Sequence, residues 1–158
     1  METLVTIERA LEIVRQTTVT SATEWVPLSQ SHNRILSEDL TSKVDDPPFD
    51  NSAMDGWAVR STDQKRVEVG RTAAGTAPLK VEAGEAIRIM TGAPMPDGAD
   101  AIVLIEDGLQ GKAHTNFIRR QGENLRKETV ALRMGQLMTP AAISMAATMG
   151  YATIPVRA

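Results

Sequence analysis

Hydrophobic positions near the N-terminus recur with the period of a helix. Between residues 6 and 16 one face collects four apolar side chains: Ile7, Ala10, Leu11 and Val14. Thr6 stands where its hydroxyl can cap the first turn, and the carboxylate of Glu8 suits the positive end of the helix dipole. The pattern predicts an amphipathic helix that packs this apolar face against another part of the protein.

A second helix is predicted near the C-terminus by its boundary residues. Thr139 can cap the helix, Pro140 suits the first helical position, and Gly150 can end it. The apolar run at residues 152–156 is typical of a strand.

Between the helices the chain shows short apolar runs separated by Gly, Pro and Asp, a pattern typical of strands and turns. Residues 25–28 predict an edge strand, because Pro27 has no N–H for a ladder. Residues 36–43 predict an extended or single-turn connector. Further strands are predicted at 57–59, 67–69, 86–89, 101–105 and 114–119, with Asp107-Gly108 as a hairpin turn between the last two.

These elements predict an α+β fold that is mostly β and has two domains. The helix and strand pieces at both ends, residues 1–43 and 122–158, are expected to pair into a small elongated domain that is discontinuous in sequence. Residues 44–121 are expected to form a compact β domain inserted into it.

Composition narrows the possible classes of function. The 158 residues are 42% hydrophobic and 23% charged, which is ordinary for a globular protein, and the net charge of −3 offers no basic footprint for nucleic acid. No apolar run is long enough to cross a membrane. The chain has no cysteine, which excludes disulfides and thiolate metal sites. Because Met1–Leu4 lacks the basic start of a signal peptide, a cytoplasmic location is expected.

Two polar stretches carry most of the candidate chemistry. Residues 47–60, PPFDNSAMDGWAVR, combine two carboxylates, an amide and a hydroxyl, and residues 88–100, RIMTGAPMPDGAD, form a second loop stiffened by prolines. Ordinary turns also use these residue types. The length of the first stretch and its echo in the second favour loops that hold oxygen ligands or bind a polar substrate.

At these residues the chain resembles the molybdopterin molybdenumtransferases, the molybdenum insertases of molybdenum-cofactor biosynthesis, with which the C-terminal half of gephyrin belongs. The resemblance continues through NRIL at residues 33–36 and GENLR at residues 122–126. It implies a transferase that joins molybdate to adenylated molybdopterin with Mg²⁺ and releases AMP. Family members are longer and add a cofactor-binding α/β domain, so the resemblance covers their N-terminal two-domain region.

The resemblance implies that Asp55 and Thr91 are catalytic, because both match family positions tied to activity. A carboxylate can orient a water or share Mg²⁺ with a substrate phosphate. Gly56, the next residue, permits close backbone approach or a positive φ. The alternatives are a turn role for Asp55 and a rigid connector for Thr91.

Asn51, Ser52 and Gly92 are the candidate substrate-binding residues. The side chains of Asn51 and Ser52 can equally satisfy loop backbone, so both interpretations stay open. Gly92 can turn the chain so that exposed backbone N–H groups cradle an oxyanion.

Other polar residues are expected to be structural or solvated. A structural role is expected for Asp50. Solvated positions are expected for Asp97, Asp100 and a basic cluster of Arg119, Arg120, Arg126 and Lys127, although arginine forks also suit oxyanions. His32 and His114 have no metal-ligand spacing, and no metal site built from side chains alone is predicted.

The chain departs from the family pattern after Arg126. Members continue through further arginines to Gly-Glu-Asp, whose aspartate is implicated in activity, whereas Glu128 is here followed by Thr129. The segment before Thr139 is also several residues short. The site is therefore expected to be relaxed or no longer catalytic.

Three functions stay open. The first is one wall of an insertase active site, inactive alone, that faces a cofactor-binding α/β domain on a partner subunit or a separate chain. The second is a non-catalytic interaction or dimerisation module for other proteins of the pathway, and the third is a β domain that binds an anionic metabolite. A weak homodimer is also expected, because the second helix would present an apolar face of Ile143, Met145 and Met149.

Overall fold

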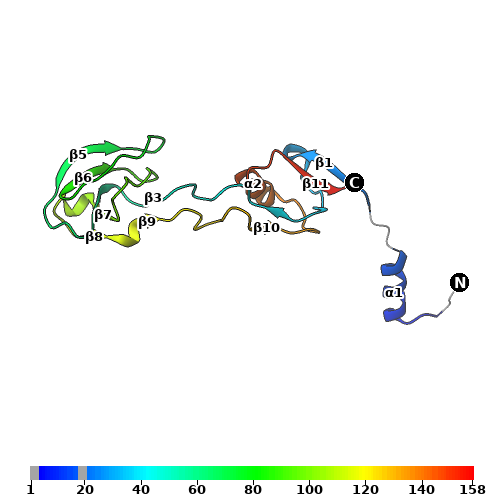
Figure 1. Ribbon diagram of the computed structural model, residues 1–158. Coiled ribbons are helices and arrows are strands. Elements are labelled where there is room, and N and C mark those ends of the chain that lie inside the picture. Colours follow the sequence, from blue (N-terminus) through cyan, green and yellow to red (C-terminus); the bar gives the residue numbers. More distant parts are fainter. Residues whose placement is uncertain (1–3, 18–20) are drawn as a thin grey trace.

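The molecule is elongated and has two lobes, shown in Figure 1 for a computed structural model that describes residues 4–17 and 21–158. The terminal lobe comprises β1 (Thr23–Pro27), η1 (Leu28–Gln30), β2 (Leu40–Thr41), β10 (Val130–Leu132), α2 (Pro140–Thr148) and β11 (Thr153–Arg157). The β lobe comprises β3 (Asn51–Ser52), β4 (Gly56–Val59), β5 (Val67–Thr72), β6 (Glu85–Ile89), β7 (Ala101–Leu104), η2 (Ile105–Asp107), β8 (Ala113–His114), η3 (Thr115–Phe117) and β9 (Ile118–Arg119). The fold is α+β and mostly β, as predicted. The expected absence of a signal peptide was based on Met1–Leu4, and residues 1–3 of this segment lie outside the described ranges.

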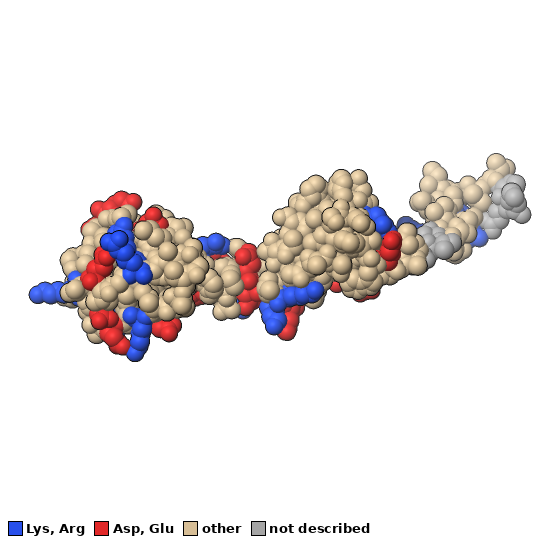
Figure 2. Space-filling view, turned by 90° about the horizontal axis from the view of Figure 1, so that it is seen from above, with Lys and Arg blue, Asp and Glu red and all other residues tan. Residues whose placement is uncertain are grey.

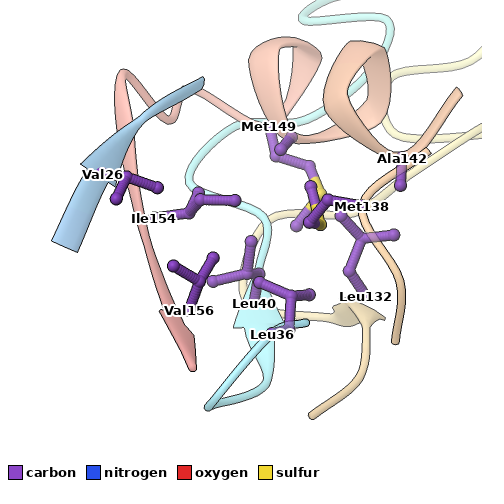
Figure 3. Close-up of a cluster of buried hydrophobic side chains, with 10 residues drawn as sticks. Val26, Leu36, Leu40, Leu132, Met138, Ala142, Met149, Ile154 and Val156 are labelled. Atoms are coloured by element: carbon purple, nitrogen blue, oxygen red, sulfur yellow. The ribbon is translucent and has the colours of Figure 1, made fainter. Parts of the chain in front are cut away.

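The terminal lobe is built from both ends of the chain. β1 pairs antiparallel with β11, with Val26 opposite Ile154, and β2 pairs antiparallel with β10. The shared core, drawn in Figure 3, contains Val26, Leu36, Leu40, Leu132, Met138, Ala142, Ala146, Met149, Ile154 and Val156. Residues far apart in sequence therefore bury one another, whereas the domain boundaries at 43/44 and 121/122 stay predictions.

Helix α2 begins and ends where the sequence predicts. The hydroxyl of Thr139 accepts from the N–H of Ala142 at 3.3 Å, Pro140 is the first helical residue, and Gly150 follows the helix with φ 88°. Of the predicted exposed face, only Met145 is exposed, at 42%. Met149 is fully buried and points into the core in Figure 3, and Ile143 packs partly buried against it. Much of this apolar surface is already covered within the chain, which removes that argument for a homodimer.

Helix α1 (Ile7–Thr17) forms as predicted, but none of its residues is buried against the rest of the described chain. The hydroxyl of Thr6 accepts from the N–H of Arg9 at 3.2 Å. The apolar face is exposed, with relative exposures of 77% for Ile7, 51% for Leu11 and 60% for Val14. In Figure 1 the helix stands apart from the terminal lobe. Periodicity specifies the helix and its apolar face but not the surface that covers it. Within the described ranges no helix is long and apolar enough to cross a membrane.

The β lobe is organised around a five-stranded sheet in the order β5-β6-β4-β7-β8. β5 runs parallel to β6, and the other neighbours are antiparallel. Two buried clusters line the sheet, one including Ala58, Ile89 and Ile102, and the other Val59 and Val103. The predicted hairpin turn is present, since β7 pairs with β8 across η2 and Gly108 has φ 70°. The predicted strand at 114–119 is instead interrupted by η3, so it contains the last residue of β8 and the whole of β9.

Two connecting segments, residues 43–50 and 119–129, join the lobes side by side (Figure 1), and Figure 2 shows that the molecule narrows there. Asp46 and Leu125 form an isolated antiparallel bridge. Asp50 accepts from the guanidinium of Arg120 at 2.6 Å and from the N–H of Gln121 at 2.8 Å. The structural role predicted for Asp50 is therefore confirmed: its carboxylate ties one connecting segment to the other.

Candidate functional site

Asp55 and Thr91 lie side by side at one end of the β-lobe sheet. β4 and β6 are antiparallel with Gly56 opposite Ile89, so the residue before β4 meets the loop after β6. The backbone N–H and the hydroxyl of Thr91 both donate to Oδ1 of Asp55, each at 2.8 Å. Both residues are exposed. The two polar loops of the sequence thus converge on one carboxylate.

These hydrogen bonds favour the ionised form of Asp55. The N–H of Thr91, its hydroxyl and the nearby charge of Arg88 hold the pKa of Asp55 below its ordinary value. The carboxylate is therefore ionised at neutral pH. Because folding lowers this pKa, ionised Asp55 stabilises the folded protein. This contribution to stability is fully present above the unfolded-state pKa and is lost as the pH falls through the folded-state pKa. Oδ2 accepts no hydrogen bond from the described residues, so one oxygen faces solvent.

Replacing Thr91 with Ala is expected to raise the pKa of Asp55 toward its ordinary value. The substitution removes the hydroxyl donor but keeps the backbone N–H donor, so the pKa stays below the ordinary value. A carboxyl-carbon NMR titration of the 158-residue protein measures the shift. Thr62→Ala, at an exposed threonine beyond the other end of β4, is the matched control and should leave this titration unchanged. An unaltered pKa in the Thr91 variant would contradict the hydrogen-bond assignment.

Only glycine fits at position 56, because strand β7 approaches the backbone closely there. A Cβ at this position would lie 2.0 Å from the carbonyl oxygen of Val103, far inside van der Waals contact. Of the two reasons predicted for this glycine, close backbone approach is the one that applies. The absence of a side chain lets β4 pair fully with β7 immediately after Asp55.

Gly56→Ala is expected to destabilise the protein by about 2–3 kcal/mol, because strands β4 and β7 must separate to relieve the clash. Chemical denaturation followed by circular dichroism measures the free energy of unfolding. Gly92→Ala is the control. Its added Cβ meets no atom within 4 Å, and its φ of 79° alone costs roughly 1 kcal/mol. Equal losses in the two variants would show that the contact with Val103 is not the cause.

Asn51 and Ser52 face inward in β3. Both are buried; the amide of Asn51 donates to the carbonyl of Phe49 at 3.2 Å, and the hydroxyl of Ser52 donates to the carbonyl of Met54 at 2.5 Å. Ser52 also exchanges backbone hydrogen bonds with Ala93 and Gly92. The two side chains bond their own loop, and the backbone of Ser52 joins it to the loop after β6. The predicted contact of these side chains with substrate gains no support from the geometry.

The loop after β6 does not form the oxyanion cradle that was expected around Gly92. The N–H of Thr91 is donated to Asp55, that of Gly92 to the carbonyl of Ser52 at 2.8 Å, and that of Ala93 to the carbonyl of Met90 at 3.0 Å. Gly92 is exposed and does turn the chain with φ 79°. Its N–H supports the fold, so an anion at this site needs a different donor.

Trp57 and Arg88, predicted as ordinary strand residues, lie beside Asp55. They are cross-strand partners of β4 and β6, and the guanidinium carbon of Arg88 lies 4.6 Å from the centre of the Trp57 ring. The indole N–H donates to Glu68 at 2.7 Å, and Arg71 donates to the same carboxylate at 3.4 Å. A single sequence signal pointed to them: a charged residue inside the otherwise apolar strand 86–89.

The other charged candidates are engaged elsewhere. Arg119 pairs with Glu123 at 2.7 Å and Arg120 with Asp50, which confirms a surface role for these two residues of the basic cluster.

A hollow of about 360 Å³ lies at the opposite end of β4, lined by Arg60, Thr62, Lys80, Val81, Glu82, Gly98 and Asp100. The carboxylate of Asp100 accepts hydrogen bonds from the N–H and the hydroxyl of Ser61 at 2.6 and 2.8 Å. Asp100 therefore fixes the turn at Ser61 and is not only solvated.

Comparison with known proteins identifies the family. The family described as "MoeA N-terminal region (domain I and II)" matches residues 5–150. The chain belongs to this family. The molybdopterin molybdenumtransferase of Synechococcus elongatus is 41% identical over 155 residues, which cover 85% of this chain and 38% of the relative. That of Haemophilus influenzae is 36% identical over 169 residues, which cover 96% of this chain and 41% of the relative.

Solved structures agree with this assignment. The molybdopterin biosynthesis MoeA protein of Pyrococcus horikoshii OT3 has a TM-score of 0.85 and 32% identity, and the match covers 98% of this chain and 46% of that one. Another structure, of a molybdopterin biosynthesis MoeA protein from Pyrococcus horikoshii, has a TM-score of 0.82 and 28% identity, and the match covers 98% of this chain and 44% of that one. The chain thus spans less than half the length of the relatives it matches, and it corresponds to the N-terminal region of a MoeA-type protein of molybdenum-cofactor biosynthesis.

The site of this MoeA region could bind Mg²⁺ only together with other ligands, such as water and substrate phosphate. Among residues 4–17 and 21–158, no three or more His, Cys, Asp or Glu side chains gather as a metal cage. Oδ2 of Asp55 is one open carboxylate oxygen, which is enough for an ion held mainly by water and substrate phosphate. Thr129 donates its hydroxyl to the carbonyl of Arg126, and its own carbonyl accepts a hydrogen bond from the N–H of Ser42.

Proposed function

We propose that this chain forms one wall of the active site at which molybdate is inserted into adenylated molybdopterin. The observation that carries the proposal is the Asp55–Thr91 pair, an exposed ionised carboxylate whose orientation is fixed by two donors to one oxygen. The printed name of the relatives, molybdopterin molybdenumtransferase, supports the class of reaction.

Asp55 and Thr91 have different roles in this proposal: Asp55 supplies the carboxylate, and Thr91 positions it. Thr91 holds Oδ1, so that Oδ2 is presented in one direction, where it can orient a water or accept a proton. When Mg²⁺ is bound, Oδ2 would be its protein ligand, and the ion would neutralise charge on substrate oxyanions. The Thr91 hydroxyl acts by positioning the carboxylate and by lowering its pKa.

The remaining walls of the site are assigned to the part of the relatives that this chain does not match. A cofactor-binding α/β domain, on the same subunit, on a partner subunit or on a separate chain, would hold the pterin and the molybdate against Asp55. A weak homodimer belongs to this proposal, and the exposed apolar face of α1 now supports it better than α2 does.

A chimaera tests the proposal. Residues 5–150 replace the matched region of the Synechococcus elongatus relative, and insertion is measured by reconstitution of a cofactor-free molybdoenzyme with adenylated molybdopterin, molybdate and Mg²⁺. We expect turnover well above that of the same relative lacking its N-terminal region. A folded chimaera without turnover would instead favour the non-catalytic interaction module, consistent with Thr129 at the place of the family aspartate.

A further inference from the structure

We propose that Arg88, held on the ring of Trp57 beside Asp55, is the oxyanion-binding residue of this wall and takes a tetrahedral oxyanion, either a phosphoryl group or molybdate. The inference rests on the proposed function and adds the group that contacts the anionic part of the substrate.

The guanidinium of Arg88 is fixed in place while its donors stay unengaged. Trp57 supports one face of the group, with 4.6 Å between the guanidinium carbon and the ring centre. The ring is itself anchored by the 2.7 Å hydrogen bond from its N–H to Glu68. Arg88 is half-buried, and within the described chain it forms neither a side-chain hydrogen bond nor an ion pair. Its N–H edge is therefore available to a ligand.

The position of Arg88 places its charge next to the candidate carboxylate. Arg88 stands one residue before the end of β6, and the loop that begins after β6 brings Thr91 to Asp55. Its charge contributes to the lowered pKa of both Asp55 and Glu68 without bonding to either. A guanidinium that is near two carboxylates but paired with neither keeps its directional donors for a third group.

Other donors near the site are already committed. The N–H groups of Thr91, Gly92 and Ala93 are donated within the protein. Arg71 is exposed and pairs with Glu68. Arg88 is thus the cation of this wall that can meet an oxyanion, and the fork of a guanidinium matches two oxygens of a tetrahedral anion. The charge of Asp55 opposes binding, so affinity for the 158-residue protein alone is expected to be on the order of millimolar.

Anion titration of the full 158-residue protein tests the proposal. Trp25→Phe makes Trp57 the single tryptophan, so its fluorescence reports on the stacked guanidinium, and the backbone amide resonance of Thr91 gives a second readout. Inorganic phosphate, AMP and molybdate are titrated separately at constant ionic strength with chloride as the balancing anion. Saturable binding of phosphate and AMP points to a phosphoryl ligand, and preference for molybdate points to the metal oxyanion.

Two variants decide the assignment. Arg88→Gln is expected to weaken binding by at least about tenfold, whereas Arg71→Gln, which removes an equally charged neighbour, should change it less than about twofold. Arg88→Lys should recover part of the affinity, because it restores charge without the fork. Equal affinity in the Arg88→Gln protein and the parent, or a linear response to every anion, would overturn the proposal. If the chimaera is active but anion binding does not depend on Arg88, only this inference is contradicted. If anion binding depends on Arg88 but the chimaera is inactive, the proposed function is contradicted.

Discussion

The 158-residue protein alone is expected to insert no molybdate into adenylated molybdopterin. Insertion requires the pterin, the AMP phosphate and the oxyanion to be held together in one geometry, and loss of that positioning costs orders of magnitude in rate. Asp55 and Thr91 are exposed at the end of the sheet, and the hollow of the β lobe lies at the opposite end of β4. Among the described residues, Asp55 and Thr91 are therefore not enclosed by a second wall that could hold a substrate against Asp55. The matched region covers 38% and 41% of the length of the two relatives.

The assay is reconstitution of a cofactor-free molybdoenzyme by the purified chain, adenylated molybdopterin, molybdate and Mg²⁺. The chimaera of residues 5–150 with the Synechococcus relative is the positive control. Activity of the isolated chain above the protein-free background would place the chemistry within these residues and contradict the assignment of the other walls.

Local boundary signals predicted the elements well. The helix over 140–148 followed from Thr139, Pro140 and Gly150, each of which acts within a few residues of its own position. Most of the predicted strands followed from short apolar runs, and their ends were correct to within one to three residues because turns are specified locally. The short strands β2, β3 and β10 were not predicted. The interruption at η3 was missed, since a single 3-10 turn carries no comparable signal.

Packing was harder to predict than the elements. Helix α2 is apolar on several sides, so its pattern does not tell which face the rest of the chain covers, and Met149 proved to be inside. Helix α1 shows the converse, an apolar face without a cover. For α2 the deciding partners, such as Val26 and Leu36, lie far away in sequence.

The candidate site was found by resemblance rather than by geometry. Nothing in a single sequence states that Thr91 donates to Asp55, because that contact depends on the register of β4 against β6. Asn51 and Ser52 show why loop residues are ambiguous: the same side chains can bond a ligand or their own loop, and here they bond the loop. Arg88 was overlooked because its significance depends on the ring across the strand.

Asp55→Asn in the chimaera is expected to reduce molybdate insertion by on the order of 100-fold with little change in stability. The carbonyl oxygen of an asparagine can still accept both hydrogen bonds from Thr91, so the junction of the two loops is retained. The substitution replaces the solvent-facing carboxylate oxygen with an NH₂ group, which neither carries charge nor accepts a proton. Turnover should therefore fall while the unfolding temperature stays close to that of the parent.

Asp55→Ala provides the contrast that separates chemistry from structure. It removes the acceptor as well as the charge, leaving the N–H of Thr91 without its partner, so both turnover and stability should fall. Asp97→Asn, at an exposed aspartate of the second polar loop, is the matched control and should affect neither. If Asp55→Asn retained full turnover while Asp55→Ala unfolded, Asp55 would be a structural turn residue. The carboxylate charge would then have no part in the reaction, because the hydrogen bonds alone would account for its presence.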